Sequence, residues 1–186
     1  LGSHSTGLVA ANQEFEKWLK NDKSMPFGPN NEHVTIKLVD YDNPNNNEFI
    51  VTKEWTFIQA GVEKRFDVVH LINGIPVVIG EVKTPVRDAV SWLDGALQVH
   101  DDYELNVSQM FVPNVFSYAS EGKAFRYGSV RMPIEMWGPW REDEGHALSD
   151  VRRTLKSLMR PEVILDILQN FTLFATDKKH RAIKII

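Results

Sequence analysis

Two apolar runs joined by the dipeptide Asn73-Gly74 constrain the fold of this chain more than any other feature. The first run covers residues 66–72 and the second covers residues 75–83. Asn-Gly strongly favours a two-residue hairpin turn, because both residues tolerate positive φ. The sequence therefore predicts two adjacent antiparallel strands, apolar on both faces as in the centre of a covered sheet.

Asp67 lies near the start of the first run, and Glu81 and Lys83 lie at the end of the second. With a two-residue turn and an unbroken ladder, Asp67 would lie opposite Gly80, and the two carboxylates would project from opposite faces. One bulge or a three-residue loop pairs Asp67 with Glu81 on one face, with Lys83 beside them. Pro76 cannot donate to the ladder and favours this irregular pairing, which we predict.

Two carboxylates and one ammonium group at the end of a sheet suit metal-dependent chemistry. Mg²⁺ takes oxygen ligands, usually one or two carboxylates together with water and phosphate oxygens. An ammonium group next to them can hold the attacking water and offset charge in the transition state. We expect Asp67 and Glu81 to be metal ligands and Lys83 to be catalytic. The alternative is a structural ion pair at the strand end.

Several short motifs surround this hairpin in a fixed order. They are Asp40-Tyr41-Asp42-Asn43-Pro44, Arg65-Phe66-Asp67, Asn73-Gly74-Ile75-Pro76, Glu81-Val82-Lys83 and Glu121-Gly122-Lys123-Ala124-Phe125. With this order and spacing, residues 38–128 resemble the N-terminal nuclease domain of the R (HsdR, motor and restriction) subunit of type I restriction-modification enzymes. That family is a branch of the PD-(D/E)xK nucleases.

The resemblance implies an α/β fold with a PD-(D/E)xK, restriction endonuclease-like core, in which α-helices flank a mixed central β-sheet. It implies Mg²⁺-dependent hydrolysis of double-stranded DNA, with Asp67 and Glu81 as metal ligands and Lys83 as the catalytic lysine. ATP would act only through a helicase domain outside this chain. The implied partners are DNA and the methyltransferase and specificity subunits of a restriction complex in the bacterial cytoplasm.

A helical Gln and Tyr of that family correspond to Gln98 and Tyr103, which are candidate catalytic residues. The family commonly has three residues between them, whereas this chain has four. A five-residue step turns about 140° on an α-helix. We therefore expect these two side chains to lie on different helix faces.

Charged residues on two other predicted helices are further candidates. Glu14 lies on an amphipathic N-terminal helix, from which PD-(D/E)xK nucleases often direct an acidic residue to the metal; a solvated surface Glu is the alternative. Arg152, Arg153 and Lys156 cluster on a later helix and could contact DNA; a solvated basic face is the alternative.

The remaining elements are predicted from periodicity and turn signals. Strands are expected near 35–40, 48–58, 65–72, 76–83, 109–118 and 124–129, with a helix from Ala89 to His100. We assign residues 1–5 to a tag remnant, 6–160 to the endonuclease domain and 161–186 to a helical connector toward a helicase domain.

The composition limits the classes that this chain can belong to. Its 186 residues, 42% of them hydrophobic, suffice for one core. With no cysteine, it has neither disulfides nor a thiolate metal site. No membrane span or secretory signal is recognisable. The net charge of −4 predicts weak DNA binding by the chain alone.

Two other functions remain compatible with the sequence. One is a RecB-like or junction-resolving nuclease on the same scaffold, which would prefer branched to linear DNA. The other is a catalytically inactive scaffold that docks a DNA motor onto a methyltransferase core, in which the acidic pair would bind no cation.

Overall fold

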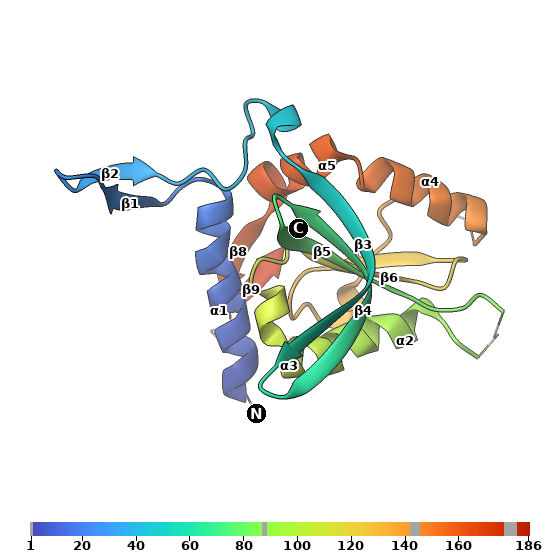
Figure 1. Ribbon diagram of the computed structural model, residues 1–186. Helices are drawn as coiled ribbons and strands as arrows, with labels where there is room; N and C mark the ends of the chain where they lie inside the picture. The colour runs from blue at the N-terminus through green and yellow to red at the C-terminus, as the bar shows by residue number, and fades with distance from the viewer. Residues whose placement is uncertain (1, 87–88, 142–145, 177–181) are drawn as a thin grey trace.

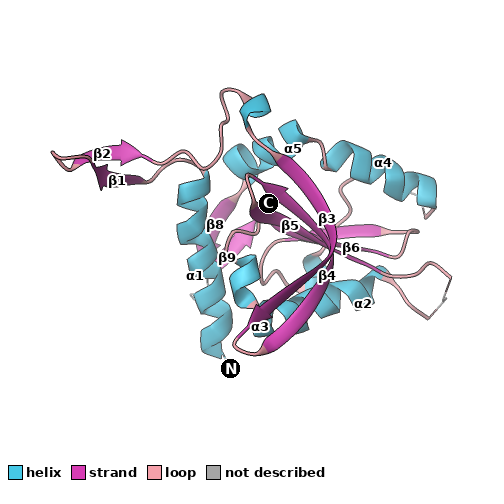
Figure 2. Cartoon of the chain, in the orientation of Figure 1, coloured by secondary structure: helices cyan, strands magenta, loops and turns pink. Residues whose placement is uncertain are grey.

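A five-stranded sheet forms the centre of the computed structural model, which describes residues 2–86, 89–141, 146–176 and 182–186 (Figures 1 and 2). The strand order is β3-β4-β5-β6-β7. Only the β5–β6 pair is parallel in this sheet. The strands are β3 (Phe49–Gln59), β4 (Val62–Ile72), β5 (Ile75–Val82), β6 (Phe116–Ser120) and β7 (Phe125–Gly128). The predicted α/β class with a mixed central sheet is confirmed.

Helices cover both faces of this sheet (Figure 1). One face packs against α2 (Trp92–Leu97), the π-helix η2 (Gln98–Tyr103), α3 (Glu104–Asn106) and part of α1 (Gly2–Leu19). The other face packs against α4 (Leu148–Leu158), α5 (Pro161–Asp166) and the π-helix η5 (Ile167–Phe171). Short 3-10 helices are η1 (Pro44–Asn46), η3 (Ser108–Phe111) and η4 (Ile134–Met136).

The β4–β5 hairpin turns at Asn73-Gly74, as predicted. Asn73 and Gly74 have φ values of 51° and 80°, the positive values that a tight hairpin turn of this kind requires. Ile72 pairs with Ile75, and the register then shifts between Leu71 and His70, so that one residue of β5 is unpaired.

That unpaired residue is Val77, because Leu71 pairs with Pro76 whereas His70 pairs with Val78. Val77 and Val78 consequently pack into the same hydrophobic cluster, whereas an unbulged strand would place them on opposite faces. The predicted bulge is confirmed. Continued past the pair Val68–Gly80, this register places Asp67 opposite Glu81.

Several predicted boundaries are wrong. Residues 36–40 are not a strand, because Thr35 ends β2 (Glu32–Thr35), which pairs only with β1 (Ser24–Phe27) in a projecting hairpin. Residues 109–115 are not a strand either, since η3 occupies their start and β6 begins at Phe116. The helix after Pro85 begins at Trp92, where Ser91 and Asp94 form a capping box.

The expected helical connector over residues 161–186 is helical only as far as Phe171. Beyond it, β8 (Leu173–Thr176) and β9 (Ala182–Ile185) form a small antiparallel pair. Lys184 of β9 is 3% exposed, and its Nζ lies 3.3 Å from the Oε2 of Glu16 on α1. Its ammonium also donates to the Asn114 carbonyl at 2.7 Å. A charge buried in this way needs such partners, so β9 is an integral part of the fold.

Gly80 is a position of close approach. A Cβ at Gly80 would lie 2.2 Å from the Tyr118 ring, which lies against the glycine from the neighbouring strand β6. The Tyr118 hydroxyl in turn contacts the His70 Nε2 at 3.2 Å. None of the helices in the described ranges has the length and hydropathy of a membrane-crossing segment.

We expect Gly80→Ala to lower the free energy of unfolding by about 1–3 kcal/mol, because the added methyl group overpacks the core against Tyr118. Urea denaturation measures the change. Gly138→Ala is the matched control, since a Cβ at Gly138 meets nothing within 4 Å. A Tyr118→Leu background should recover part of the loss. An unchanged midpoint for Gly80→Ala would contradict this account of the packing.

Candidate functional site

Asp67 and Glu81 converge at the end of the β4–β5 pair. The Asp67 Oδ2 accepts a hydrogen bond from the Val82 backbone N–H at 2.9 Å, which fixes its carboxylate across the strand end. Glu81 is only 2% exposed. The two acidic side chains are close enough for the Asp67 carboxylate to raise the pKa of Glu81. The predicted convergence of the pair is therefore confirmed.

The Glu81 carboxylate is only partly satisfied by protein groups. Its Oε1 accepts a hydrogen bond from the Lys83 ammonium at 2.6 Å, whereas its buried Oε2 has no hydrogen-bond donor. Burial raises the pKa of Glu81 to about 7, with Lys83 lowering it and Asp67 raising it further. A buried carboxylate oxygen without a donor is costly, and a bound cation would relieve that cost.

A chain of hydrogen bonds leads from Lys83 back to strand β4. The Lys83 ammonium donates to the Gln98 Oε1 at 2.5 Å, and the Gln98 Nε2 donates to the Tyr103 hydroxyl. Tyr103 then donates to the Arg65 carbonyl at 3.1 Å, two residues before Asp67. Burial raises the pKa of Tyr103, which keeps this hydroxyl protonated. This series of hydrogen bonds therefore links the end of β5 to β4 through the helix.

The prediction that Gln98 and Tyr103 lie on different faces is wrong, because residues 98–103 form a π-helix. The 140° separation applies to an α-helix. In a π-helix the hydrogen bonds join residues five apart, so a residue and its fifth successor share a face. The Tyr103 ring is anchored by edge contact with Phe66, with 4.9 Å between centroids.

Gly95 is a residue that the motif analysis missed. A Cβ there would lie 3.3 Å from the Glu81 Cγ and 3.2 Å from the Ala119 Cβ, so the glycine lets α2 pack directly onto the site. Leu93 and Leu97, apolar residues of the same helix, are 42% and 40% exposed. A glycine within an otherwise helical pattern was the available signal for this close packing.

The structure does not bring Glu14 to this site. Glu14 lies on the exposed side of α1, and its carboxylate is paired with Lys17 at 2.9 Å and Lys23 at 2.6 Å. These hydrogen bonds hold its pKa at about 2. Among the described residues, no group of three or more His, Asp or Glu side chains is arranged to hold a metal ion. Asp67 and Glu81 are therefore the acidic pair to consider.

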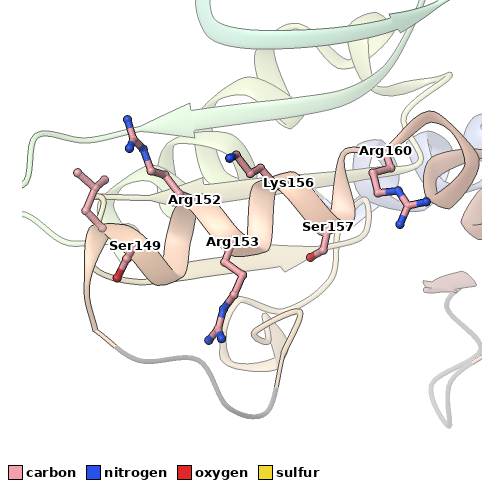
Figure 3. A pocket seen from close by; sticks show the side chains of 7 residues that line it. Ser149, Arg152, Arg153, Lys156, Ser157 and Arg160 are labelled. Atoms are coloured by element: carbon pink, nitrogen blue, oxygen red, sulfur yellow. The ribbon is translucent and has the colours of Figure 1, made fainter.

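Arg152, Arg153 and Lys156 are exposed on α4, where they line a shallow groove (Figure 3). Arg152 and Lys156 project to one side of the helix, and Arg153 projects to the other. Arg153 is paired with Asp150 of the same helix at 3.2 Å.

The comparisons with known proteins identify the family of the chain. The sequence profile of the family described as "Type I restriction enzyme R protein N terminus" matches residues 2–135, which include Asp67, Glu81, Lys83, Gln98 and Tyr103. The chain belongs to this R-protein N-terminal family.

Two relatives illustrate the range of the family. The type I restriction enzyme HindI endonuclease subunit of Haemophilus influenzae is 29% identical over 96% of this chain and 18% of its own length. A Methanocaldococcus jannaschii protein, whose name assigns it to the endonuclease subunit of type I restriction enzyme MjaIXP, is 29% identical over 68% of this chain and 12% of its own length. The chain thus spans less than a fifth of either relative.

We expect Glu81→Gln to raise the free energy of unfolding by about 1–3 kcal/mol above pH 7, because the buried charge is removed. The pKa of Glu81 is raised in the folded state to about 7, so its protonated form stabilises the fold at low pH. That contribution is lost as the pH rises through 7. The free energies of unfolding of the variant and the wild type should therefore become equal as the pH falls toward 4.5. Thermal unfolding across this range measures the difference.

Glu63→Gln, at an exposed position on β4, is the matched control and should change little at any pH. A Glu81→Gln protein that is less stable than the wild type at pH 8 would contradict the description of Glu81 as an unsatisfied buried charge.

Proposed function

We propose that this chain is the DNA-cleaving module of its subunit, with a PD-(D/E)xK catalytic site. It hydrolyses phosphodiester bonds of double-stranded DNA with Mg²⁺ held by Asp67 and Glu81. The observation that carries the proposal is the buried Glu81 Oε2, which has no donor and lies beside a second carboxylate. Glu16, Glu104 and Glu121 also have a buried oxygen without a donor, and Glu81 differs from them in lying opposite the Asp67 carboxylate on the β4–β5 pair.

The donor set fits a hard divalent cation. Mg²⁺ commonly binds through one or two carboxylates and completes its shell with water and substrate phosphate oxygens. When bound, the cation would activate water and neutralise charge that develops on the phosphate. Asp67 is already oriented for such a role, because the Val82 N–H fixes one of its oxygens.

Lys83 is suited to contact the reacting phosphate or the water. An ammonium group has three N–H donors, and Glu81 and Gln98 accept two of them. The third remains for a phosphate oxygen or the attacking water, where a fixed positive charge offsets the charge of the transition state. The Lys83 side chain is 21% exposed, so this end of the site is open to a ligand.

Gln98 and Tyr103 act as positioning residues in this proposal. They touch neither the carboxylate pair nor the substrate; they hold the Lys83 ammonium in place through the hydrogen bonds that end at the Arg65 carbonyl. A lysine side chain loses considerable rotamer freedom when it is fixed, and the helix supplies this ordering in advance.

The remainder of the subunit would bring this module to DNA. The chain has a net charge of −4, and binding to DNA depends largely on cationic contacts with phosphates. Its relatives are more than five times as long as the matched region. ATP-driven translocation and site recognition, with the methyltransferase and specificity subunits as partners, belong in this proposal to those other parts.

We expect Asp67→Ala, Glu81→Ala and Lys83→Ala to reduce DNA cleavage by the full-length subunit, assembled with its partners, by about a hundredfold or more. ATP hydrolysis and translocation should continue, because the site lies in the nuclease module. Gel assays on linear and branched duplexes measure cleavage, and a preference for branched DNA would favour a junction-resolving enzyme instead.

Lys64→Ala is the matched control, since Lys64 lies on β4 and is paired with Asp102 at 2.7 Å, outside the site. Calorimetric titration with Mn²⁺ in the presence of a DNA fragment should show binding that Asp67→Ala abolishes. Retained cleavage by all three site variants would overturn the assignment, and failure to bind a cation would favour an inactive docking scaffold.

We expect Tyr103→Phe to lower the kcat of cleavage about tenfold while leaving DNA affinity unchanged, because the lost hydroxyl releases Gln98 and with it Lys83. Single-turnover cleavage together with equilibrium DNA binding separates these effects. Tyr127→Phe is the control, since Tyr127 is a half-buried ring on β7. Equal losses in kcat and DNA affinity would show that Tyr103 does more than position Lys83.

A further inference from the structure

Helix α4 carries a shallow groove that is rich in basic side chains. Its lining includes four basic residues, Arg152, Arg153, Lys156 and Arg160 (Figure 3). The serines Ser149 and Ser157 also line it and add hydroxyl groups. Four basic residues and two hydroxyls in one groove form a surface suited to a polyanion.

Two of the four basic side chains lack an acidic partner. Arg153 is ion-paired within α4 at 3.2 Å, and Arg160 donates to Glu162 at 2.8 Å. Within the described part of the chain, Arg152 and Lys156 take part in no ion pair or hydrogen bond, and both are exposed. Their charges are therefore available to a ligand.

Many basic side chains elsewhere in the protein are engaged with its own carboxylates. Such pairs involve Lys17, Lys20, Lys23, Lys64, Arg131 and Lys184. An intramolecular pair of this kind partly cancels the attraction to an external anion. The two exposed cations Arg152 and Lys156 are thus notable in a chain whose net charge is −4.

The N-terminal end of α4 lies near the strand ends that carry the candidate catalytic site, although α4 covers the opposite face of the sheet from α2. A methyl group placed on Gly122, in the turn after β6, would contact both Pro85 at 3.6 Å and Leu148 at 3.7 Å. Pro85 follows Lys83 by two residues, and Leu148 is the first residue of α4. The N-terminal end of α4 therefore lies beside the segment that leaves the site.

We propose that α4 is a phosphate-contacting helix, on which Arg152 and Lys156 hold the backbone of double-stranded DNA as it approaches the site of Asp67, Glu81 and Lys83. In taking DNA as the ligand, this inference rests on the proposed function.

The spacing of the two residues fits this role. Residues four apart lie one above the other on a helix, about 6 Å apart along its axis. Figure 3 shows their side chains on the same side of α4. Two long cationic side chains at this separation can reach neighbouring phosphates of one strand, and contacts of this kind position the duplex without reading its sequence.

The test uses the 186-residue chain, a short fluorescent DNA duplex and a chelator that prevents cleavage. Fluorescence anisotropy at salt concentrations between about 50 and 200 mM gives the slope of log affinity against log salt. For Arg152→Ala/Lys156→Ala we expect affinity to fall about tenfold and the slope to decrease by about 1.8, since each lost phosphate contact removes about 0.9.

Lys17→Ala/Lys37→Ala is the matched control, because it removes two positive charges from exposed positions outside α4. It should leave the slope almost unchanged. The inference is overturned if the α4 variant has the wild-type slope, if the control loses as much, or if the wild-type chain does not bind the duplex at the lowest salt concentration.

The same assay separates this inference from the proposed function. If the site variants still cut DNA, the catalytic assignment fails while the α4 result stands. If the α4 variant binds normally, the inference fails even when cleavage depends on Asp67.

Discussion

One unpaired residue in β5 determines that the two candidate metal ligands lie on the same face of the sheet. Because Val77 is bulged, the pairing of β4 with β5 shifts by one residue, and Asp67 comes to face the same side as Glu81. An unbroken ladder from the same turn would have separated the two carboxylates by the thickness of the sheet. The helix α2 then covers the side on which they meet, with Gly95 as the point of contact.

A π-helix aligns the side chains of Gln98 and Tyr103. The spacing between Gln98 and Tyr103 is one residue longer than is common in the family, and on an α-helix this would turn the two side chains apart. The π-helix accommodates the additional residue and restores the alignment. The hydrogen bonds from Lys83 through the helix to β4 consequently remain intact. The bulge and this π-helix thus both align side chains of the candidate site.

The candidate site contains a buried charge that lowers the stability of the folded state. Glu81 is buried with one oxygen unsatisfied, and a buried charge of this kind lowers the stability of the protein at neutral pH. Lys184 is a second buried charge, whose pKa burial lowers to about 8, but Glu16 at 3.3 Å and the Asn114 carbonyl at 2.7 Å stabilise its charged form. The arrangement at Glu81 suits a group that binds a ligand. The arrangement at Lys184 suits a group that holds the two ends of the chain together.

Features that depend on a few neighbouring residues could be predicted from the sequence. They are the Asn73-Gly74 turn, the two apolar runs, and the need for an irregularity beside Pro76. The motif order also identified the family, which the comparison established. Only the tertiary structure decided that the irregularity is a bulge at Val77, that a π-helix aligns Tyr103 with its partner, and that Glu14 pairs with lysines instead of joining the site. The physical reason is that a turn depends on local φ preferences, whereas bulges, helix type and the choice of ion-pair partner depend on packing between segments far apart in the chain.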